Sequence, residues 1–186
     1  MIIGYTYNDD SVIDLFLDIT TKCNLNCSYC FARHFKEWEQ IQSFKHLSFI
    51  EKTLRFSKYK FNIILFGGEA LLHPEIKEII ELFLNSTKTN QVILLSNGLL
   101  DEEFYQDERI TYCLTLHNYI NDKQFEKFNY TCSKVKNLIV NLILENSEKF
   151  IKRYEILKNY KIILKKLFHK FNYLLIFKRR NSNSLR

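Results

Sequence analysis

The stretch VIDLFLDITTKCNLNCSYC, residues 12–30, decides the fold, because a predicted strand runs directly into three closely spaced cysteines. In residues 12–20 apolar residues alternate with Asp14, Phe16 and Asp18, which is the two-residue period of a β-strand. A parallel strand covered on both faces would be apolar throughout. The alternation therefore favours a barrel, or an open partial one, whose inner wall lines a wet ligand site.

Outward from this stretch, short apolar runs alternate with segments of helical period. Such alternation is typical of βα units around a parallel sheet and predicts an α/β fold. The predicted strands are Val12–Thr20, Phe61–Phe66, Gln91–Ser96, Thr111–His117, Lys136–Leu144 and Asn172–Phe177. The predicted helices are Leu47–Lys60, Glu75–Ser86, Asn121–Phe128 and Ser147–Lys170.

Length and composition bound the class of protein. The chain has 186 residues, of which 46% are hydrophobic and 26% charged, so we expect a globular core domain over residues 1–177. No apolar run is long enough for a membrane span, and the N-terminus lacks the features of a secretory signal. We expect a cytoplasmic protein with reduced thiols, in which Cys113 and Cys132 are small buried residues.

Charge is distributed unevenly along the chain. From Lys149 onward there are 12 of the 27 Lys and Arg residues but only one of the 21 acidic residues. Residues 178–186 are expected to form a basic tail. Apolar residues at helical spacing from Phe150 to Phe171 favour a barrel helix packed on the sheet, with docking to a membrane surface or a nucleic acid as the alternative.

The three cysteines Cys23, Cys27 and Cys30 have the spacing C-x3-C-x2-C on one short loop. Thiolates are the ligands that iron–sulfur clusters use, and three of them leave one iron of a four-iron cluster open to a substrate or cofactor. His34 follows four positions after the last cysteine, so a closed zinc site of the Cys3His type is the alternative.

Two glycine turns follow the next strands of the predicted sheet. Gly67-Gly68-Glu69 ends the second strand, where glycines allow a close approach of the backbone to a ligand and Glu69 offers a carboxylate to an ammonium group. Ser96-Asn97-Gly98 ends the third strand. Ligands bind at the carboxyl edge of parallel βα folds, so both turns favour a site there rather than a zinc knuckle.

Polar side chains fall at the same edge of the fourth and fifth strands. They are Thr115, His117, Asn141 and Glu145. We expect them to face the same ligand site.

Taken together, Cys23-x3-Cys27-x-Tyr29-Cys30, Gly67-Gly68-Glu69 and Ser96-Asn97-Gly98 resemble the successive motifs of the radical S-adenosylmethionine (radical SAM) superfamily. The resemblance covers residues 12–145 and implies a partial (β/α)6 barrel with parallel strands. Two positions depart mildly from the family pattern, since Ala70 replaces a usual proline and Ser96 a common threonine. Without a second cysteine cluster, the subgroup that carries auxiliary clusters is disfavoured.

The resemblance also implies cofactors and site residues. Cys23, Cys27 and Cys30 would hold a [4Fe–4S] cluster whose open iron binds S-adenosylmethionine. Reductive cleavage would then give a 5′-deoxyadenosyl radical that removes a hydrogen atom from an unidentified substrate. By residue match the cofactor contacts would be Gly67, Gly68 and Glu69 at the methionyl amino group, Tyr29 through its backbone near the adenine, Ser96 and Asn97, and Thr115, His117 and Asn141 at the ribose or carboxylate.

The expected partners are an electron donor such as flavodoxin or ferredoxin and, from the basic C-terminal region, an acidic macromolecular substrate: a peptide, a protein or a nucleic acid. Two other hypotheses stay open at this point. One is a degenerate family member that binds the cluster without turnover, and the other is a non-enzymatic zinc module.

Overall fold

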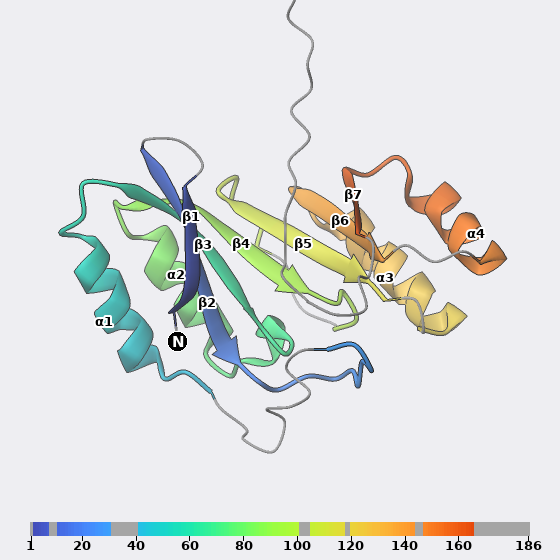
Figure 1. The fold of residues 1–186 in the computed structure, drawn as a ribbon, viewed down its shortest axis with the longest axis horizontal. Helices are drawn as coiled ribbons and strands as arrows, with labels where there is room; N and C mark the ends of the chain where they lie inside the picture. The colour runs from blue at the N-terminus through green and yellow to red at the C-terminus, as the bar shows by residue number, and fades with distance from the viewer. Residues whose placement is uncertain are drawn as a thin grey trace, which may run out of the picture.

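One seven-stranded sheet organises the protein. The computed structural model describes residues 2–7, 11–30, 41–100, 105–117, 120–143 and 147–165. The strands follow one another in space in the order β1-β2-β3-β4-β5-β6-β7 (Figure 1). Their bounds are β1 Ile2–Tyr7, β2 Val12–Thr20, β3 Lys60–Gly67, β4 Thr89–Ser96, β5 Ile110–Leu116, β6 Leu138–Ile143 and β7 Ile162–Lys165.

The strands from β2 to β7 are all parallel, and only β1 runs antiparallel, at the edge beside β2. The helices are α1 Phe44–Leu54, the short 3-10 helix η2 Ala70–Leu72, α2 Ile76–Leu84, α3 Asp122–Lys134 and α4 Glu148–Leu157. Six parallel strands in sequential order, with helices in the connections, confirm the predicted α/β fold and its partial (β/α)6 barrel. The connection between β4 and β5 has no helix within its described residues.

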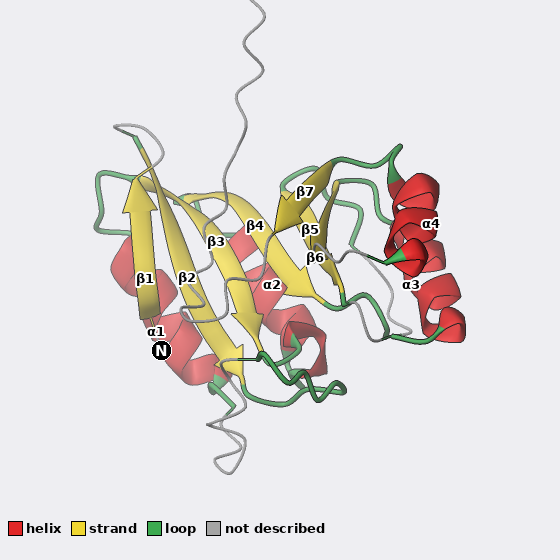
Figure 2. Cartoon of the chain, turned by 45° about the vertical axis from the view of Figure 1, so that its right-hand side comes forward, coloured by secondary structure: helices red, strands yellow, loops and turns green. Residues whose placement is uncertain are grey.

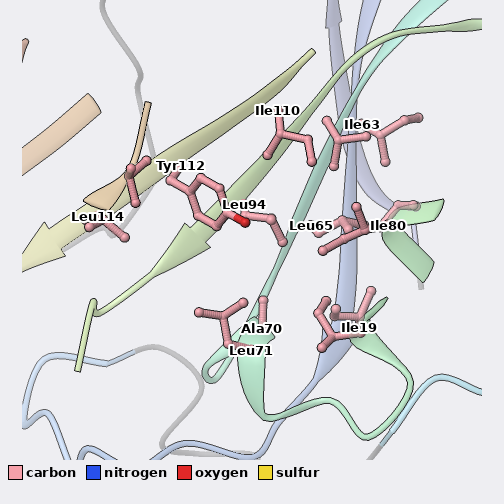
Figure 3. Packing of buried hydrophobic residues seen from close by; sticks show 14 of the residues in the cluster. Ile19, Ile63, Leu65, Ala70, Leu71, Ile80, Leu94, Ile110, Tyr112 and Leu114 are labelled. Carbon is pink, nitrogen blue, oxygen red and sulfur yellow. The ribbon is translucent and has the colours of Figure 1, made fainter. Parts of the chain in front are cut away.

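The two faces of the sheet differ as the alternation in residues 12–20 predicts. In Figure 2 the helices α1 and α2 lie behind the sheet, while α3 and α4 flank its other end. The covered face packs into a hydrophobic core in which Ile63, Leu65 and Leu94 are 0% exposed (Figure 3). On the opposite face Asp14 and Phe16 stay half-exposed. This second face is the inner wall that the sequence predicted.

Five of the six predicted strands coincide with β2 to β6 within two residues at each end, and the first three predicted helices coincide with α1, α2 and α3 with shifted ends. The start of α3 follows from a capping box, in which Asn121 accepts from the backbone N–H of Gln124 and the Gln124 side chain accepts from that of Asn121. Local capping chemistry therefore places this boundary where the sequence predicted it.

The predicted helix Ser147–Lys170 is wrong over residues 158–165. The chain turns after α4, with the N–H of Tyr160 donating to the carbonyl of Leu157, and then forms β7, whose Ile162 pairs with Val140 of β6. The run of β-branched and apolar residues in β7 gains more from pairing with the sheet edge than from continuing the helix. The interruption by β7 excludes a single amphipathic helix from Phe150 to Phe171, whether packed on the sheet as the sequence favoured or used for docking.

The strand β1 was not predicted from the sequence, although IIGYTY is rich in the β-branched and aromatic residues that favour strands. The predicted strand Asn172–Phe177, the basic tail 178–186, His34 and Glu145 lie outside the described residues. None of the helices within the described ranges has the length and apolar character that crossing a bilayer requires.

Candidate active site at the carboxyl edge of the sheet

The cysteine loop leaves the sheet where β2 ends. Cys27 is buried and Cys23 and Cys30 are half-buried; the N–H of Cys30 donates to the Cys27 carbonyl (3.1 Å) and that of Leu25 to Cys23 Sγ (3.4 Å). Burial raises the pKa of the Cys23 thiol, and the nearby Glu69, Cys27 and Cys30 raise it further against the opposing hydrogen bond from Leu25. The three thiols are thus close enough to influence one another.

The loop does not hold its sulfurs in finished metal geometry. Within the described residues, no three His, Cys, Asp or Glu side chains converge closely enough to hold a metal ion. Three thiols on one loop are nonetheless the donor set that an iron–sulfur cluster requires, and metal binding commonly orders such ligands. The three thiols therefore fit a cluster in kind, since they lie on one loop at the end of β2.

The Gly-Gly-Glu turn is joined to the chain that leads into the cysteine loop. The N–H of Gly68 donates to the Thr20 carbonyl and that of Glu69 to the Lys22 carbonyl, both at 2.7 Å. A Cβ on Gly67 would stand 2.0 Å from the Thr20 oxygen, and one on Gly68 2.3 Å from the Lys22 oxygen. From the sequence, we expected the two glycines to allow a ligand to approach the backbone closely. In the structure, they allow the close contact between this turn and the Thr20–Lys22 backbone.

Glu69 connects this turn to the end of β4. Its carboxylate is 1% exposed and accepts from the N–H groups of Asn97 (2.7 Å) and Leu71 (3.2 Å). Burial raises the pKa of the Glu69 carboxyl, and hydrogen bonds from Asn97, Ser96 and Leu71 partly oppose that rise. The side chain therefore fixes two turns relative to each other.

Ser96 and Asn97 complete the link to the cysteine loop. Asn97 Nδ2 donates to Asn24 Oδ1 (2.6 Å), and Ser96 Oγ accepts from the N–H of Gly98 (3.0 Å). Gly98 has a φ of 69°, in the left-handed region that favours glycine. Asn24 was missed from the sequence, since a polar residue between two cysteines carries no signal of its own.

His117 and Tyr29 form a contact that the sequence analysis did not foresee. The Tyr29 hydroxyl lies 2.6 Å from His117 Nδ1, the two rings stack with centroids 6.0 Å apart, and Cys27 Sγ lies 3.8 Å from the same nitrogen. Burial lowers the pKa of His117 to about 4, so the imidazole is neutral near pH 7. The end of β5 is thereby joined to the cysteine loop.

Thr115 and Asn141 pair across β5 and β6, one strand farther from the cysteines. Asn141 Nδ2 lies 2.7 Å from Cys113 Sγ and 3.4 Å from Thr115 Oγ1. The Asn141 side chain is buried, yet its Oδ1 has no hydrogen-bond partner in the described structure. A buried acceptor left unpaired costs about 1–3 kcal/mol, so this oxygen is a place where a ligand donor would stabilise the protein.

All twelve predicted site residues thus lie at the carboxyl edge of β2 to β6, in three groups. The cysteines, Gly67 to Glu69, Ser96 and Asn97 are joined by hydrogen bonds or electrostatic contact; Tyr29 and His117 stack beside Cys27; Thr115 and Asn141 form a separate pair. The two remaining cysteines, Cys113 and Cys132, are buried as predicted.

Comparison with known proteins identifies relatives of this chain. The sequence pattern of the Radical SAM superfamily matches residues 17–128. A probable GTP 3′,8-cyclase of Methanococcus aeolicus is 38% identical over 99 residues, which cover 50% of this chain and 31% of that protein. A tungsten-containing aldehyde ferredoxin oxidoreductase cofactor-modifying protein of Pyrococcus furiosus is 32% identical over 69 residues, 36% of this chain and 19% of that protein.

Among solved structures, native anSMEcpe with bound AdoMet and Kp18Cys peptide superposes with a TM-score of 0.67 at 18% identity, covering 89% of this chain and 56% of that one. A second structure, histidine-tagged anSMEcpe with bound AdoMet, gives 0.65 at 16% identity, covering 84% and 50%. These likenesses show a shared fold. The matches span about a third or less of the curated relatives.

Proposed function

Because the chain belongs to the radical SAM superfamily, we propose that Cys23, Cys27 and Cys30 bind a [4Fe–4S] cluster and that the protein cleaves S-adenosylmethionine reductively. When bound, the cluster and the sulfonium cofactor supply one-electron chemistry that yields a 5′-deoxyadenosyl radical, which removes a hydrogen atom from the substrate. The chain's own residues bind and orient these groups.

The observation that carries the proposal is the joining of three loops at one sheet edge. The cysteine loop is hydrogen-bonded to the Gly-Gly-Glu turn through Lys22 and to the end of β4 through Asn24. A closed zinc knuckle would not need these two turns, whereas an open cluster with a chelating cofactor does. This arrangement supports assigning Gly67, Gly68 and Glu69 to the methionyl amino group, with Ser96 and Asn97 beside them.

The other side of the site is proposed to hold the nucleoside part of the cofactor. Tyr29 would lie near the adenine through its backbone, and Thr115, His117 and Asn141 would contact the ribose or carboxylate. The unpaired Oδ1 of Asn141 supports this, because a ribose hydroxyl is the kind of donor that would satisfy it.

The substrate stays at the level of a class. An acidic macromolecule is proposed from the basic C-terminal region, and an electron donor such as flavodoxin or ferredoxin from the reductive chemistry. The relative named as a probable GTP 3′,8-cyclase matches 50% of this chain, so GTP is a second candidate to test beside acidic peptides.

The first experiment measures metal content. Anaerobically reconstituted protein should hold about four irons and four sulfides per chain, and changing Cys23, Cys27 or Cys30 to Ala should abolish the cluster. Cys132→Ala is the matched control, since that thiol is buried under the sheet. Stoichiometric zinc that is lost in His34→Ala would instead establish the zinc module.

The second experiment tests cofactor turnover. With dithionite and S-adenosylmethionine, the reconstituted protein should form 5′-deoxyadenosine slowly even without substrate. Iron retained without any 5′-deoxyadenosine, under every reductant tried, would establish the degenerate alternative.

A further inference from the structure

One side of α1 carries a stripe of exposed residues that no described element covers. Ile41, Lys45, Phe49, Lys52 and Phe56 are spaced by four, four, three and four positions, which places the helical and flanking members on one side of the helix. Ile41, Phe49 and Phe56 are 37%, 68% and 92% exposed, and both lysines are exposed. We name these five residues the α1 stripe.

The opposite side of α1 provides its attachment. Leu47, Ile50 and Glu51 are buried there, and α1 contacts α2. Figure 1 shows α1 at the outside of the molecule, at the β1–β2 end of the sheet. Exposed aromatic side chains gathered on one helix side, with its other side packed, are typical of an interaction surface.

Charge identifies the kind of partner. Glu51 is the only acidic residue within α1, and it is buried and bonded to Arg55 Nε at 2.8 Å. The stripe itself carries only the positive charges of Lys45 and Lys52. A second copy of the chain docking stripe to stripe would oppose like charges, whereas an acidic partner would complement them.

Position identifies what that partner could do. Ile41 forms a β-bridge with Thr20, and the N–H of Gln42 donates to the Ile19 carbonyl at 2.9 Å. The first residue of the stripe therefore lies beside Thr20 at the end of β2, and Thr20 is three residues before Cys23 in the chain. A protein lying on the stripe would reach the edge of the sheet from which the cysteine loop leaves.

We propose that the α1 stripe is the docking surface for an acidic one-electron carrier protein of the flavodoxin type. The proposal rests on the proposed function, because only a redox-active cysteine loop needs such a partner. Electron-transfer encounters are small, wet and governed by charge, which suits a stripe of two aromatics, one aliphatic and two lysines. The phenylalanines supply the apolar centre and the lysines the steering.

The test uses reconstituted holoprotein and reduced flavodoxin as the probe. The variants are Lys45→Glu with Lys52→Glu, and Phe49→Ser with Phe56→Ser. The matched control is Lys77→Glu with Lys123→Glu, which reverses two exposed charges on α2 and α3. Binding is measured by fluorescence anisotropy of labelled flavodoxin at several salt concentrations, and turnover as 5′-deoxyadenosine formed with flavodoxin or with dithionite.

We expect both stripe variants to raise the Kd for flavodoxin at least tenfold and to slow flavodoxin-driven turnover similarly, while dithionite-driven turnover is unchanged. The control should match the wild type, and wild-type binding should weaken as salt rises. Unchanged binding in the stripe variants would overturn the proposal. So would a monomer–dimer equilibrium, or binding to anionic phosphatidylglycerol vesicles, that the Phe49→Ser/Phe56→Ser variant abolishes.

Failure of the proposed function gives a different result. Without a working cluster, dithionite-driven turnover is absent in the wild type too, whereas anisotropy still reports whether flavodoxin binds the stripe.

Discussion

The carboxyl edge of β2 to β4 and the carboxyl ends of β5 and β6 are the two sides of the proposed site, yet they are built differently. On the first side, glycines, backbone N–H groups and the Glu69 carboxylate join three turns within hydrogen-bond distance. On the second side, Asn141 is buried with one acceptor unpaired in the described structure. The first side satisfies its own polar groups, whereas the second has an acceptor left for a ligand.

This difference separates two ways of making a binding site. A self-satisfied side holds its shape before any ligand arrives, which suits the support of a metal loop. A side with an unpaired buried acceptor costs stability in the free protein and gains it back on binding. Substitutions on the first side should therefore affect folding, and substitutions on the second should affect binding.

The largest effect should come from Gly68→Ala on the first side. A methyl group there would lie 2.3 Å from the Lys22 carbonyl oxygen and 2.6 Å from that of Thr21, and these backbone atoms cannot move aside as a flexible side chain can. We expect the free energy of unfolding to fall by about 3 kcal/mol, measured by urea denaturation. Gly98→Ala, whose methyl would meet the Phe128 ring at 2.9 Å, adds about 1–2 kcal/mol of strain at a φ of 69° but should still cost less, because a side chain can shift. Equal losses would show that the β2–β3 contact is not special.

Glu69→Gln should have the next largest effect. The two Glu69 carboxylate oxygens accept hydrogen bonds from the backbone N–H groups of Asn97 and Leu71. In glutamine one of these oxygens is replaced by an NH2 group, which cannot accept, so one backbone N–H would lose its partner. We expect a loss of about 2 kcal/mol in urea denaturation at neutral pH. Gln124→Glu at the exposed cap of α3 is a control for a change between the same two residue types. A neutral outcome for Glu69→Gln would mean that these hydrogen bonds do not stabilise the edge.

The pH dependence of the same residue sharpens this test. Burial raises the folded-state pKa of Glu69 above its ordinary value of 4.5, so between the two values the folded protein binds more protons than the unfolded chain. Its contribution to stability is complete below pH 4.5 and is lost as pH rises through the folded-state pKa. Urea midpoints should therefore change less across this window in Glu69→Gln than in the wild type. An identical profile would contradict the raised pKa.

Asn24→Ala should have a smaller effect, because it removes one hydrogen bond between the cysteine loop and Asn97 while leaving the backbone contacts intact. Asn24 is exposed, so we expect a loss of about 0.5–1 kcal/mol in thermal or urea denaturation. The exposed Asn85→Ala, at the end of α2, serves as the control. A larger loss than that of Glu69→Gln would reverse the order proposed for the first side.

The smallest effect on folding should come from Asn141→Leu on the second side. Leucine has a similar volume and removes the unpaired acceptor, so the free energy of unfolding should change by less than about 1 kcal/mol. Binding of S-adenosylmethionine to reconstituted protein should nevertheless weaken about tenfold, which equals about 1.4 kcal/mol, measured by equilibrium dialysis. Asn137→Leu, which lies just before β6 and so at the opposite end of that strand, should bind normally. Strong destabilisation without loss of binding would contradict the two-sided description.

Much of the fold could be predicted from local patterns. The alternation in residues 12–20, the three cysteines and the glycine turns identified the parallel sheet and its carboxyl edge, because strand period and turn chemistry depend on neighbouring residues. The error at β7 arose because Phe150, Tyr154 and Leu157 do lie on a helix, and the same spacing continues by coincidence into residues that pair with β6.

The sequence by itself determined the family, since only residue type and spacing are needed to recognise a three-thiol loop followed by Gly67-Gly68-Glu69 and Ser96-Asn97-Gly98. Tertiary structure decided what those residues touch. It turned the glycines toward the Thr20–Lys22 backbone, engaged the Glu69 carboxylate with the N–H of Asn97, and stacked His117 on Tyr29. The physical reason is that such contacts join strands far apart in the chain, and their distances are set by the packing of the whole sheet rather than by local periodicity.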